Sequence, residues 1–528
     1  MRRTKQNFLN SAAICLASAV VGLTAAPAFA DTIKLMGVQG DINLEGEFIK
    51  FENDIFTIRT SLGDLNIAAD AVTCEGAACP QNAAQAGEIT IVGSETLGTG
   101  LMPFLIEGFA TEDGATIESQ RNVNGYLTTE VIGDGGFGEP VGTFRVLSNS
   151  SSDAFTALQS PDVKIGMSSR RILPAEARQL RNFGAGNLIE LNQEHVVAVD
   201  SLSVIVHPDN PLGTISLENL DLIFSGRITN WAEIGGPNAP IVLYSREDGS
   251  GSQAVFEERV FAQSGRVQTD AVEVVPSHEA MASAVRANPF AIGYVGSAFE
   301  RGTKALDLVG SCGLSFSPNA FSAKTEEYPL QRRLYLYNRA DNVDATTQEF
   351  IDYVTSDAAD SVIAKSGLIN LSISRVQQDR ENGRIRSVLQ NAVDPFEFQL
   401  ARDMLLDMFE WNRLSTTFRF ASGSARLDGK GLEDLGRLID FLKVQPAGTE
   451  VSVVGFTDGD GAFGSNQGLS VVRAQQVADE LLNAGGADLQ NVSVGVKGYG
   501  ELSPAACNDS LEGKRINRRV EVWVRQGA

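Results

Sequence analysis

Residues 244–252, which read Tyr-Ser-Arg-Glu-Asp-Gly-Ser-Gly-Ser, most restrict how this chain can fold. They follow an apolar run at residues 241–243 that predicts a buried strand, and they precede a segment with the apolar spacing of a helix. The first N–H groups of a helix lack intrahelical partners and the helix dipole is positive there, so such a turn can bind an anion. Gly249 and Gly251 would let the backbone approach a ligand closely. The ordinary alternative is a strand–turn–helix junction with a serine N-cap.

Predicted strands and helices alternate from about residue 88 to about residue 372, which indicates α/β architecture. Four turns rich in Ser, Thr or Gly stand at strand ends or helix starts, at residues 93–97, 148–153, 166–170 and 246–252. Ligands of α/β sheets bind at this edge. One serine-rich turn is usually a helix cap. Four of them, with the guanidinium of Arg246, predict a cage of dipoles for an oxyanion.

The start of the chain and its charge indicate where the protein works. Residues 1–30 have the basic start, the short apolar core and the Ala-Phe-Ala cleavage motif of a secretory signal peptide. We expect cleavage before Asp31 and no membrane-spanning segment afterwards. The chain holds 43 basic and 66 acidic residues, a formal net charge of −23. This acidity argues against nucleic acid and anionic lipid as partners, and an anion site must therefore work through local donors.

Cysteine and histidine positions give expectations about disulfides and metals. Cys74 and Cys79 lie five residues apart in a chain with an export signal, which predicts a small disulfide loop. Cys312 and Cys507 lie far apart in sequence, and we expect each to be a lone buried thiol. The histidines show no metal-ligand spacing, so we expect structural or surface roles for them, no metal site and no cofactor. They are His195, His207 and His278.

The segment from residue 88 to residue 372 resembles the periplasmic phosphate-binding proteins of ABC transporters, the PstS-like family. Residues 93–97, 165–170 and 246–252 look like the family's three ligand segments, and residues 223–231 look like its second-lobe signature. The resemblance implies a two-lobed periplasmic-binding-protein fold of type II that closes on inorganic phosphate. It also implies an ABC permease as a candidate partner.

The resemblance further implies the residues that would bind phosphate. Arg246 would be the cation on the anion, paired with Asp248, and the turns would supply hydroxyl and backbone donors. The implied residues are Ser94, Thr96, Leu97, Ser151, Ser168, Ser169, Arg246, Asp248, Ser250, Gly251 and Ser252.

One position departs from the family pattern. Ser169 stands where the family has an aspartate that accepts the proton of hydrogen phosphate and so excludes sulfate. Glu95 is a candidate substitute acceptor, but the interpretation that we favour makes Glu95 a solvated loop residue. Selectivity for phosphate over sulfate therefore stays open.

Two other segments flank this part of the chain. Residues 31–80 alternate apolar and polar positions between turns, which predicts a small β-module of hairpins. Residues 373–415 begin as a charged stretch and continue with apolar residues near helical spacing. We predict a linker with a helix there, capped at Asp394 and Pro395. Packing on a neighbouring domain is favoured over partner binding for this helix.

Residues 416–526 resemble the OmpA-like peptidoglycan-binding domain, a βαβαββ α/β sandwich. A Thr-Asp pair, a Leu-Ser-x-x-Arg-Ala run fifteen residues further on and an Asn-Arg-Arg run match its motifs. In that family the Asp and the Arg bind the diaminopimelate of the stem peptide. The acid pairs with the ammonium of diaminopimelate, and the guanidinium pairs with its carboxylate. The implied residues are Asp458, Asn466, Leu469, Arg473 and Arg518. A structural Asp–Arg pair is the alternative, and Phe456 stands where the family often has His.

These features favour an α/β multidomain protein of the periplasm, associated with peptidoglycan and the outer membrane, that captures, transports or senses phosphate without catalysis. A phosphatase-like enzyme is one alternative, but the sequence shows no nucleophile beside a base and no metal cluster. A structural wall protein that has lost its ligand is another. The presence of Arg246, Asp248 and Ser250 argues against such a loss.

Overall fold

The structure, a computed structural model, describes residues 32–37, 43–52, 55–61, 63–68, 72–76, 87–138, 140–378, 382–420 and 429–526. It divides into two compact units, Met1–Gln85 and Ala86–Ala528. The predicted signal peptide, residues 1–30, lies outside the described residues. None of the helices in the described ranges has both the length and the apolar character that crossing a membrane requires.

The first unit is an antiparallel sheet in the order β4-β3-β2-β1-β5. Its strands are β1 (Thr32–Gly37), β2 (Asn43–Glu52), β3 (Ile55–Thr60), β4 (Gly63–Ala68) and β5 (Val72–Glu75). Alternate residues of β1 and β3 form a small buried core, since neighbouring side chains of a strand point to opposite faces. The predicted hairpins are present. Cys74 is disulfide-bonded, and its expected partner Cys79 lies outside the described residues.

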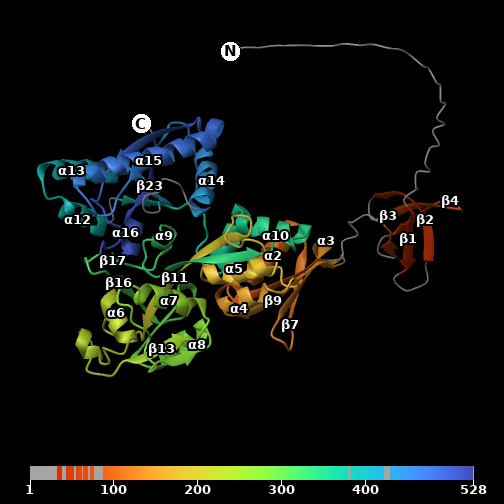
Figure 1. The fold of residues 1–528 in the computed structure, drawn as a ribbon, viewed down its shortest axis with the longest axis horizontal. Coiled ribbons are helices and arrows are strands. Elements are labelled where there is room, and N and C mark those ends of the chain that lie inside the picture. The colour runs from red at the N-terminus through yellow and green to blue at the C-terminus, as the bar shows by residue number, and fades with distance from the viewer. Residues whose placement is uncertain are drawn as a thin grey trace, which may run out of the picture. The chain divides into compact units, whose positions relative to one another are not determined.

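The large sheet of the second unit runs through two lobes that share strand β11 (Glu194–Val206). The first part of β11 pairs with β18 (Gln331–Asn338), and its last part pairs with β15 (Ala291–Gly296). We call the part built on β18 lobe 1 and the part built on β15 lobe 2. Figure 1 shows lobe 1 mainly in orange and lobe 2 mainly in yellow-green. The predicted two-lobed fold is confirmed.

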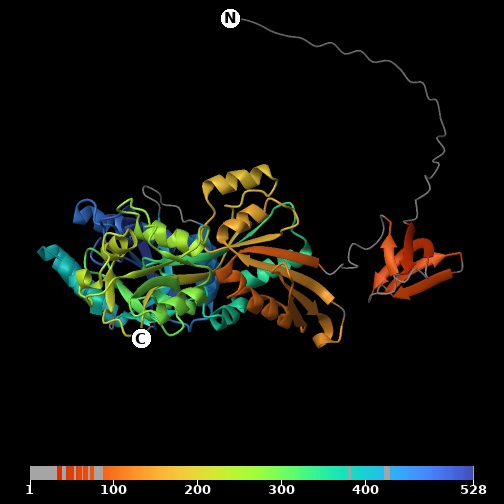
Figure 2. The ribbon, with the colours of Figure 1, turned by 90° about the horizontal axis from the view of Figure 1, so that it is seen from below.

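Lobe 1 is a mixed sheet in the order β18-β10-β6-β9-β8-β7 with helices on both faces (Figure 2). The strands are β6 (Gly87–Ser94), β7 (Thr116–Arg121), β8 (Leu127–Ile132), β9 (Pro140–Asn149) and β10 (Ile165–Ser168). The helices are α1 (Glu95–Gly98), α2 (Met102–Glu112), α3 (Gly133–Gly136), α4 (Ser151–Ala157), α5 (Pro174–Asn182), α10 (Ala345–Thr355) and α11 (Asp360–Lys365). Strands β10, β6 and β9 are parallel, so their carboxyl ends meet at one edge, where α1 and α4 begin.

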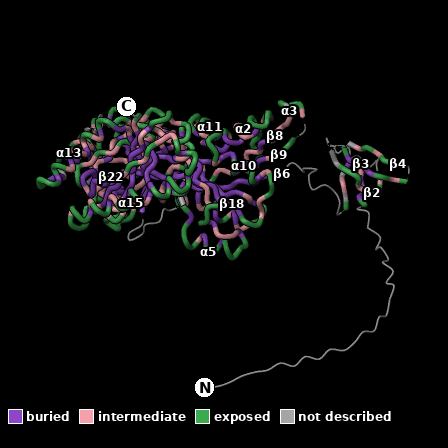
Figure 3. The backbone as a smooth tube through the Cα atoms, turned by 90° about the horizontal axis from the view of Figure 1, so that it is seen from above, coloured by how far each residue is buried: buried purple, intermediate pink, exposed green. Residues whose placement is uncertain are grey.

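Lobe 2 contains the predicted strand–turn–helix junction. The junction is β13 (Val242–Arg246) followed by α7 (Gly251–Val260). The other strands are β12 (Thr214–Ser216), β14 (Glu273–Val275), β16 (Lys304–Val309) and β17 (Ser315–Phe316), and the other helices are α6 (Leu217–Phe224) and α8 (His278–Ala287). Aromatic packing holds α6 and α7 on the sheet, because Phe256 stacks on Tyr294 at 4.0 Å and meets Phe224 edge-on. Central strands such as β18 are mainly buried (Figure 3).

The remaining residues, 374–526, form what we call the C-terminal domain. Its sheet has the order β19-β20-β23-β21-β22. The strands are β19 (Arg375–Gln377), β20 (Asn412–Arg419), β21 (Thr449–Gly455), β22 (Val492–Gly498) and β23 (Arg519–Gln526). The helices are α12 (Asn382–Asn391), α13 (Pro395–Glu410), α14 (Gly429–Lys443), α15 (Phe463–Gly485) and α16 (Leu511–Asn517).

The predicted linker is part of this domain. Strand β19 pairs with β20, and α13 packs on the sheet through Met404 and Met408, which cluster with Tyr499 and Trp523. Asp394 caps α13 through the N–H groups of Phe396 and Glu397, as its sequence predicts. The helix therefore packs on its own domain, which agrees with the favoured interpretation.

Lobe 2 is joined covalently to the C-terminal domain. Cys312 and Cys507 form a disulfide with their Cα atoms 5.6 Å apart. The expectation of two lone thiols is wrong, because the fold brings the turn after β16 against the loop before α16 although 195 residues separate the cysteines. Close by, Arg259 of α7 pairs with Glu512 of α16 at 2.6 Å.

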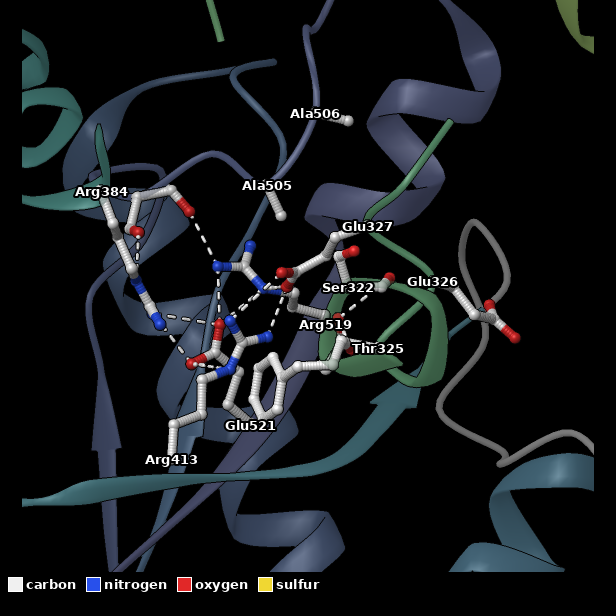
Figure 4. Close-up of polar contacts among 12 residues, drawn as sticks. Ser322, Thr325, Glu326, Glu327, Arg384, Arg413, Ala505, Ala506, Arg519 and Glu521 are labelled. Atoms are coloured by element: carbon white, nitrogen blue, oxygen red, sulfur yellow. Dashed lines mark hydrogen bonds and ion pairs between the residues drawn. The ribbon is translucent and has the colours of Figure 1, made fainter. Parts of the chain in front are cut away.

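A buried ion cluster continues this contact (Figure 4). The turn after α9 (Ala320–Lys324) places Glu327 against Arg413 and Arg519 of the C-terminal domain, and Glu521 pairs with the same two arginines and with Arg384. The neighbouring Glu326 points away from this group and pairs with other arginines, which are Arg333, Arg419 and Arg515. Each carboxylate has arginine partners, which is what makes such deep burial tolerable.

Candidate functional site

The serine-rich turns of the two lobes meet around a small polar cavity of about 220 Å³, open solvent included. Strands β6 and β13 end at it, and helices α1, α4 and α7 begin there. The lining residues are Ser94, Glu95, Thr96, Asn149, Ser150, Ser151, Ser169, Arg246, Glu247, Ser250, Gly251 and Ser252. The lining holds no large apolar side chain, so the cavity suits a small hydrophilic ligand.

Most of the implied ligand residues line this cavity, and three do not. Those that line it are Ser94, Thr96, Ser151, Ser169, Arg246, Ser250, Gly251 and Ser252. Leu97 is fully buried in the core of lobe 1. The Ser168 hydroxyl donates to the Arg170 carbonyl at 2.7 Å, which turns it away from the cavity. Asp248 is exposed and accepts a hydrogen bond from Gln253.

The partner of Arg246 is Glu95 and not Asp248. Arg246 Nη2 lies 2.8 Å from Glu95 Oε2 and donates equally closely to the Pro276 carbonyl. The prediction of an Arg246–Asp248 pair is therefore wrong, because Asp248 faces solvent. The interpretation of Glu95 as a solvated loop residue is also wrong, since only 18% of its side chain is exposed.

Two features of this pair suit a ligand site. Arg246 is 4% exposed, and its Nε is buried with no hydrogen-bond partner among the described residues. Burial raises the pKa of Glu95 above its usual value, although Arg246 opposes this shift. The cavity thus combines one cation that has unused hydrogen-bonding capacity with one carboxylate that is easier to protonate than usual.

The two lobes touch across the cavity. Within lobe 1, the Ser151 hydroxyl accepts the N–H of Ser169 at 3.0 Å and lies 3.1 Å from the Ser169 hydroxyl. Gly251, at the start of α7 in lobe 2, comes so close that an added Cβ would lie 2.2 Å from Ser169 Oγ and 2.3 Å from Ser151 Oγ. The structure therefore represents a closed arrangement of the lobes, and glycine at this position permits it.

Two buried residues that the sequence analysis did not assign to the site lie directly behind it. His278, expected to be structural or on the surface, places Nε2 3.2 Å from both Thr96 Oγ1 and Ser252 Oγ. Arg332 donates to the same two oxygens and pairs with Asp200. Burial, with Arg332 and Arg246 nearby, holds the pKa of His278 well below its usual value, so the ring is neutral. No local motif marks either residue, because only the tertiary fold brings them to the cavity.

The arrangement offers the donors that an oxyanion needs. Hydroxyls, helix N–H groups and one guanidinium converge on the cavity. In the ranges that the structure describes, no group of three or more His, Cys, Asp or Glu side chains could hold a metal ion.

The implied peptidoglycan residues also lie together, in the C-terminal domain. Asp458 pairs with Arg518 at 2.7 Å, and Arg518 Nε and Arg473 Nη1 are buried without hydrogen-bond partners among the described residues. Burial and the neighbouring Arg518 lower the pKa of Arg473. The Asn466 side chain donates to the Asp458 and Asp460 carbonyls. Leu469 is 42% exposed on α15.

Comparison with known proteins decides the family. A family model described as the PBP superfamily domain matches residues 79–358, more than half of the chain. The chain belongs to the PBP superfamily. The phosphate-binding protein PstS of Bacillus subtilis is 28% identical over 248 residues, covering 46% of this chain and 76% of that protein. The same-named protein of Borreliella burgdorferi is 26% identical over 232 residues, covering 42% and 78%.

Solved structures and the C-terminal part give further matches. One solved structure is a putative phosphate ABC transporter substrate-binding protein with bound phosphate from Clostridium perfringens, which is 25% identical with a TM-score of 0.43. The match covers 54% of this PBP-superfamily chain and 99% of the Clostridium perfringens chain. An OmpA family model matches residues 419–518. Outer membrane porin F of Pseudomonas aeruginosa is 38% identical over 112 residues, 21% of this chain and 31% of that protein. The peptidoglycan-binding protein ArfA of Mycobacterium tuberculosis is 39% identical over 105 residues, 20% of this chain and 31% of that protein.

The two matched regions contain the two candidate sites. Every residue that lines the cavity lies within residues 79–358. Arg332 and Asp200 lie in the same region, but they do not line the cavity. Asp458, Asn466, Leu469, Arg473 and Arg518 all lie within residues 419–518. Helices α12 and α13 precede that second match and are additions to it.

Proposed function

We propose that this protein is a non-enzymatic receptor for inorganic phosphate, held at the cell wall by its C-terminal domain. The observation that carries the phosphate proposal is Arg246, whose buried Nε lacks a partner among the described residues, in a cavity lined mainly by serine and threonine hydroxyls and by helix starts. A buried donor without a partner costs about 1–3 kcal/mol, which an anion in the cavity would recover. The relatives named as phosphate-binding proteins support the choice of anion.

Specific residues are proposed to contact the anion. Arg246 supplies the charge, the starts of α1 and α7 supply backbone donors, and the hydroxyls complete the cage. The contacts are Ser94, Thr96, Ser151, Ser169, Arg246, Ser250, Gly251 and Ser252. We do not include Leu97, Ser168 or Asp248 as direct ligands, because none of them lines the cavity.

The wall attachment rests on the Asp458–Arg518–Arg473 group. Its buried guanidinium nitrogens that lack partners among the described residues can donate to a ligand carboxylate, and the Asp458 carboxylate can accept from an ammonium. Diaminopimelate carries both groups. A relative named as a peptidoglycan-binding protein supports this choice.

The proposed location is the periplasm, next to peptidoglycan and the outer membrane. Phosphate held there would be concentrated, passed to an ABC permease or sensed. We also propose limits for the parts of the chain: a signal peptide at 1–30, a β-module at 31–80, the receptor at 88–372, and a C-terminal domain that takes in β19, α12 and α13 before the OmpA-like core.

Isothermal titration with phosphate tests the receptor proposal. The mature protein should bind phosphate with a dissociation constant of about 1 µM or tighter, roughly −8 kcal/mol. Arg246→Ala should lose at least about 100-fold, because hydrogen bonds to charged groups contribute about 1.5–3 kcal/mol each. Arg145→Ala, which removes an exposed ion pair with Glu88, is the matched control and should bind normally. Absence of binding by the unaltered protein would refute the proposal.

Sedimentation with peptidoglycan tests the attachment. The full chain should sediment with peptidoglycan that contains diaminopimelate, and Arg473→Ala should remain mostly in the supernatant. Arg525→Ala removes an arginine of the same domain whose ion pairs with Glu410 and Glu450 are partly exposed, and it should sediment like the parent. Equal sedimentation of the parent and Arg473→Ala would contradict the assigned site.

A further inference from the structure

The two strands that join the lobes carry a buried ion pair directly behind the cavity. Asp200 of β11 and Arg332 of β18 are direct neighbours in the strand register. Arg332 Nη2 and Nε lie 2.6 and 3.0 Å from Asp200 Oδ2, and the two side chains are 1% and 0% exposed. Asp200 Oδ1 accepts N–H groups from Ser201 and Ser297. With these partners the pair has a fixed position, as a charge pair at such depth requires.

From this position Arg332 reaches one ligand hydroxyl of each lobe. Its Nη1 donates to Ser252 Oγ of lobe 2 at 2.5 Å, and its Nη2 donates to Thr96 Oγ1 of lobe 1 at 3.2 Å. Both hydroxyls line the cavity, whereas Arg332 does not. Arg332 therefore stands one hydroxyl away from the cavity and bridges the two lobes in this closed arrangement.

His278 acts on the same hydroxyls from lobe 2. The N–H of Gly296 donates to His278 Nδ1 at 3.3 Å, so in a neutral ring the proton is on Nε2. Nε2 faces Thr96 Oγ1 and Ser252 Oγ, and it can only donate to them. A guanidinium also only donates. Both hydroxyl oxygens thus accept hydrogen bonds from Arg332 and His278 on the side away from the cavity. Their own hydrogens are then free to point into the cavity.

We propose that Arg332 is a positioning residue of the ligand cage. This inference rests on the proposed phosphate function and adds a means by which closure and binding are coupled. Held by Asp200 on the connecting strands, Arg332 fixes the Thr96 and Ser252 hydroxyls as donors toward the anion. Asp200 neutralises the charge of Arg332, so Arg332 would contribute to binding by directing hydrogen bonds. The rigid fork of N–H donors on the guanidinium sets that direction.

A double-mutant cycle tests this role. Arg332→Lys keeps the charge but cannot reach Asp200, Thr96 and Ser252 together. We expect it to weaken phosphate binding about 10- to 100-fold, the effect of about one hydrogen bond to a charged group. In a Thr96→Val/Ser252→Ala background the same substitution should change binding by less than about threefold, because the hydroxyls through which it acts are absent. Arg145→Lys, on the surface of lobe 1, is the matched control and should have no effect in either background.

A second variant covers the case in which Arg332→Lys does not fold. An added Cβ at Gly296 would lie 2.7 Å from Asp200 Oδ2 and 3.2 Å from Arg332 Nη2, so Gly296→Ala should displace the pair without removing a charge. Gly296→Ala should weaken phosphate binding in the parent, and it should have little effect in the Thr96→Val/Ser252→Ala background. An equal loss of affinity in both backgrounds, or no loss in either, would overturn the positioning role. If the unaltered protein binds phosphate and the cycle fails, only this inference is wrong; if it binds none, the proposed function fails as well.

Discussion

At the scale of single residues, Glu95 is the side chain best placed to discriminate between hydrogen phosphate and sulfate. It is the only carboxylate of the described cavity lining that is not exposed, since Glu247 faces solvent. A fully ionised sulfate would meet this carboxylate with no proton to share, whereas hydrogen phosphate could donate its O–H to it. Its burial and raised pKa are consistent with a shared proton. Glu95 could therefore provide the acceptor that Ser169 does not.

Glu95→Gln should reduce the preference for phosphate over sulfate. The amide can donate to sulfate and no longer repels it, so the ratio of the two association constants should fall by about tenfold or more. Competition titrations with the two anions would measure the ratio. Glu247→Gln removes an exposed carboxylate beside the same cavity and should leave the ratio nearly unchanged. A ratio that is the same in Glu95→Gln and in the parent would rule out Glu95 as the selecting residue.

At the scale of elements, the first turn of helix α7 both lines the cavity and contacts lobe 1. Gly251 begins the helix, lines the cavity and touches the serines of lobe 1. Its helix start is available to an anion because the first N–H groups have no intrahelical partners. The same close approach means that the position has no room for a side chain when the lobes are closed.

Gly251→Ala should weaken phosphate binding by at least about tenfold with little loss of thermal stability. The new methyl group would force the Ser151 and Ser169 hydroxyls out of place or hold the lobes apart, whereas alanine itself favours the helix. Titration calorimetry and thermal unfolding would measure the two effects. Gly436→Ala in α14, where a Cβ meets nothing within 4 Å, is the control for alanine in a helix and should bind normally. Normal binding by Gly251→Ala would show that closure tolerates the methyl group.

The sequence predicted local elements of the site better than their partners. The turn at residues 244–252 was recognisable because its glycines, serines and arginine are contiguous and lie between a strand and a helix. The partner of Arg246 could not be recognised from the sequence, because Glu95 and Asp248 both lie in or next to a predicted ligand turn. Only the packing between the lobes distinguishes them. Arg332 and His278 lie within an ordinary strand and an ordinary helix, so no local pattern marked them. Strand β19, within the predicted linker, carries no local pattern either, since only its pairing with β20 identifies it.

At the scale of the whole molecule, the disulfide distinguishes how the two lobes of the second unit are attached to the C-terminal domain. Lobe 2 is held to the C-terminal domain by the Cys312–Cys507 disulfide, the Arg259–Glu512 pair and the ion cluster around Glu327 and Glu521. No comparable disulfide joins lobe 1 to that domain among the described residues. In a protein anchored through the C-terminal domain, closure on a ligand would therefore move lobe 1 toward a stationary lobe 2.

The ion cluster should make this attachment sensitive to acid. Burial alone would raise the pKa of Glu326 and Glu327, but the surrounding arginines outweigh it and lower both pKa values, that of Glu326 strongly. A carboxyl whose pKa is lowered on folding stabilises the folded state above its unfolded pKa of about 4.3. That contribution is lost as the pH falls from about 4.3 through the lowered value.

Glu327→Gln should destabilise the protein by about 3 kcal/mol at pH 7, because it leaves Arg413 buried with less compensating charge. Denaturant unfolding would measure the loss. The difference from the parent should shrink as the pH falls below about 4.3, where the carboxyl of the unfolded parent becomes protonated before that of the folded parent. Glu410→Gln removes a carboxylate from an ion pair whose Glu side chain is 60% exposed, and it should cost no more than about 0.5 kcal/mol. Equal effects of the two substitutions, or a loss independent of pH, would mean that the buried cluster does not hold lobe 2 to the C-terminal domain.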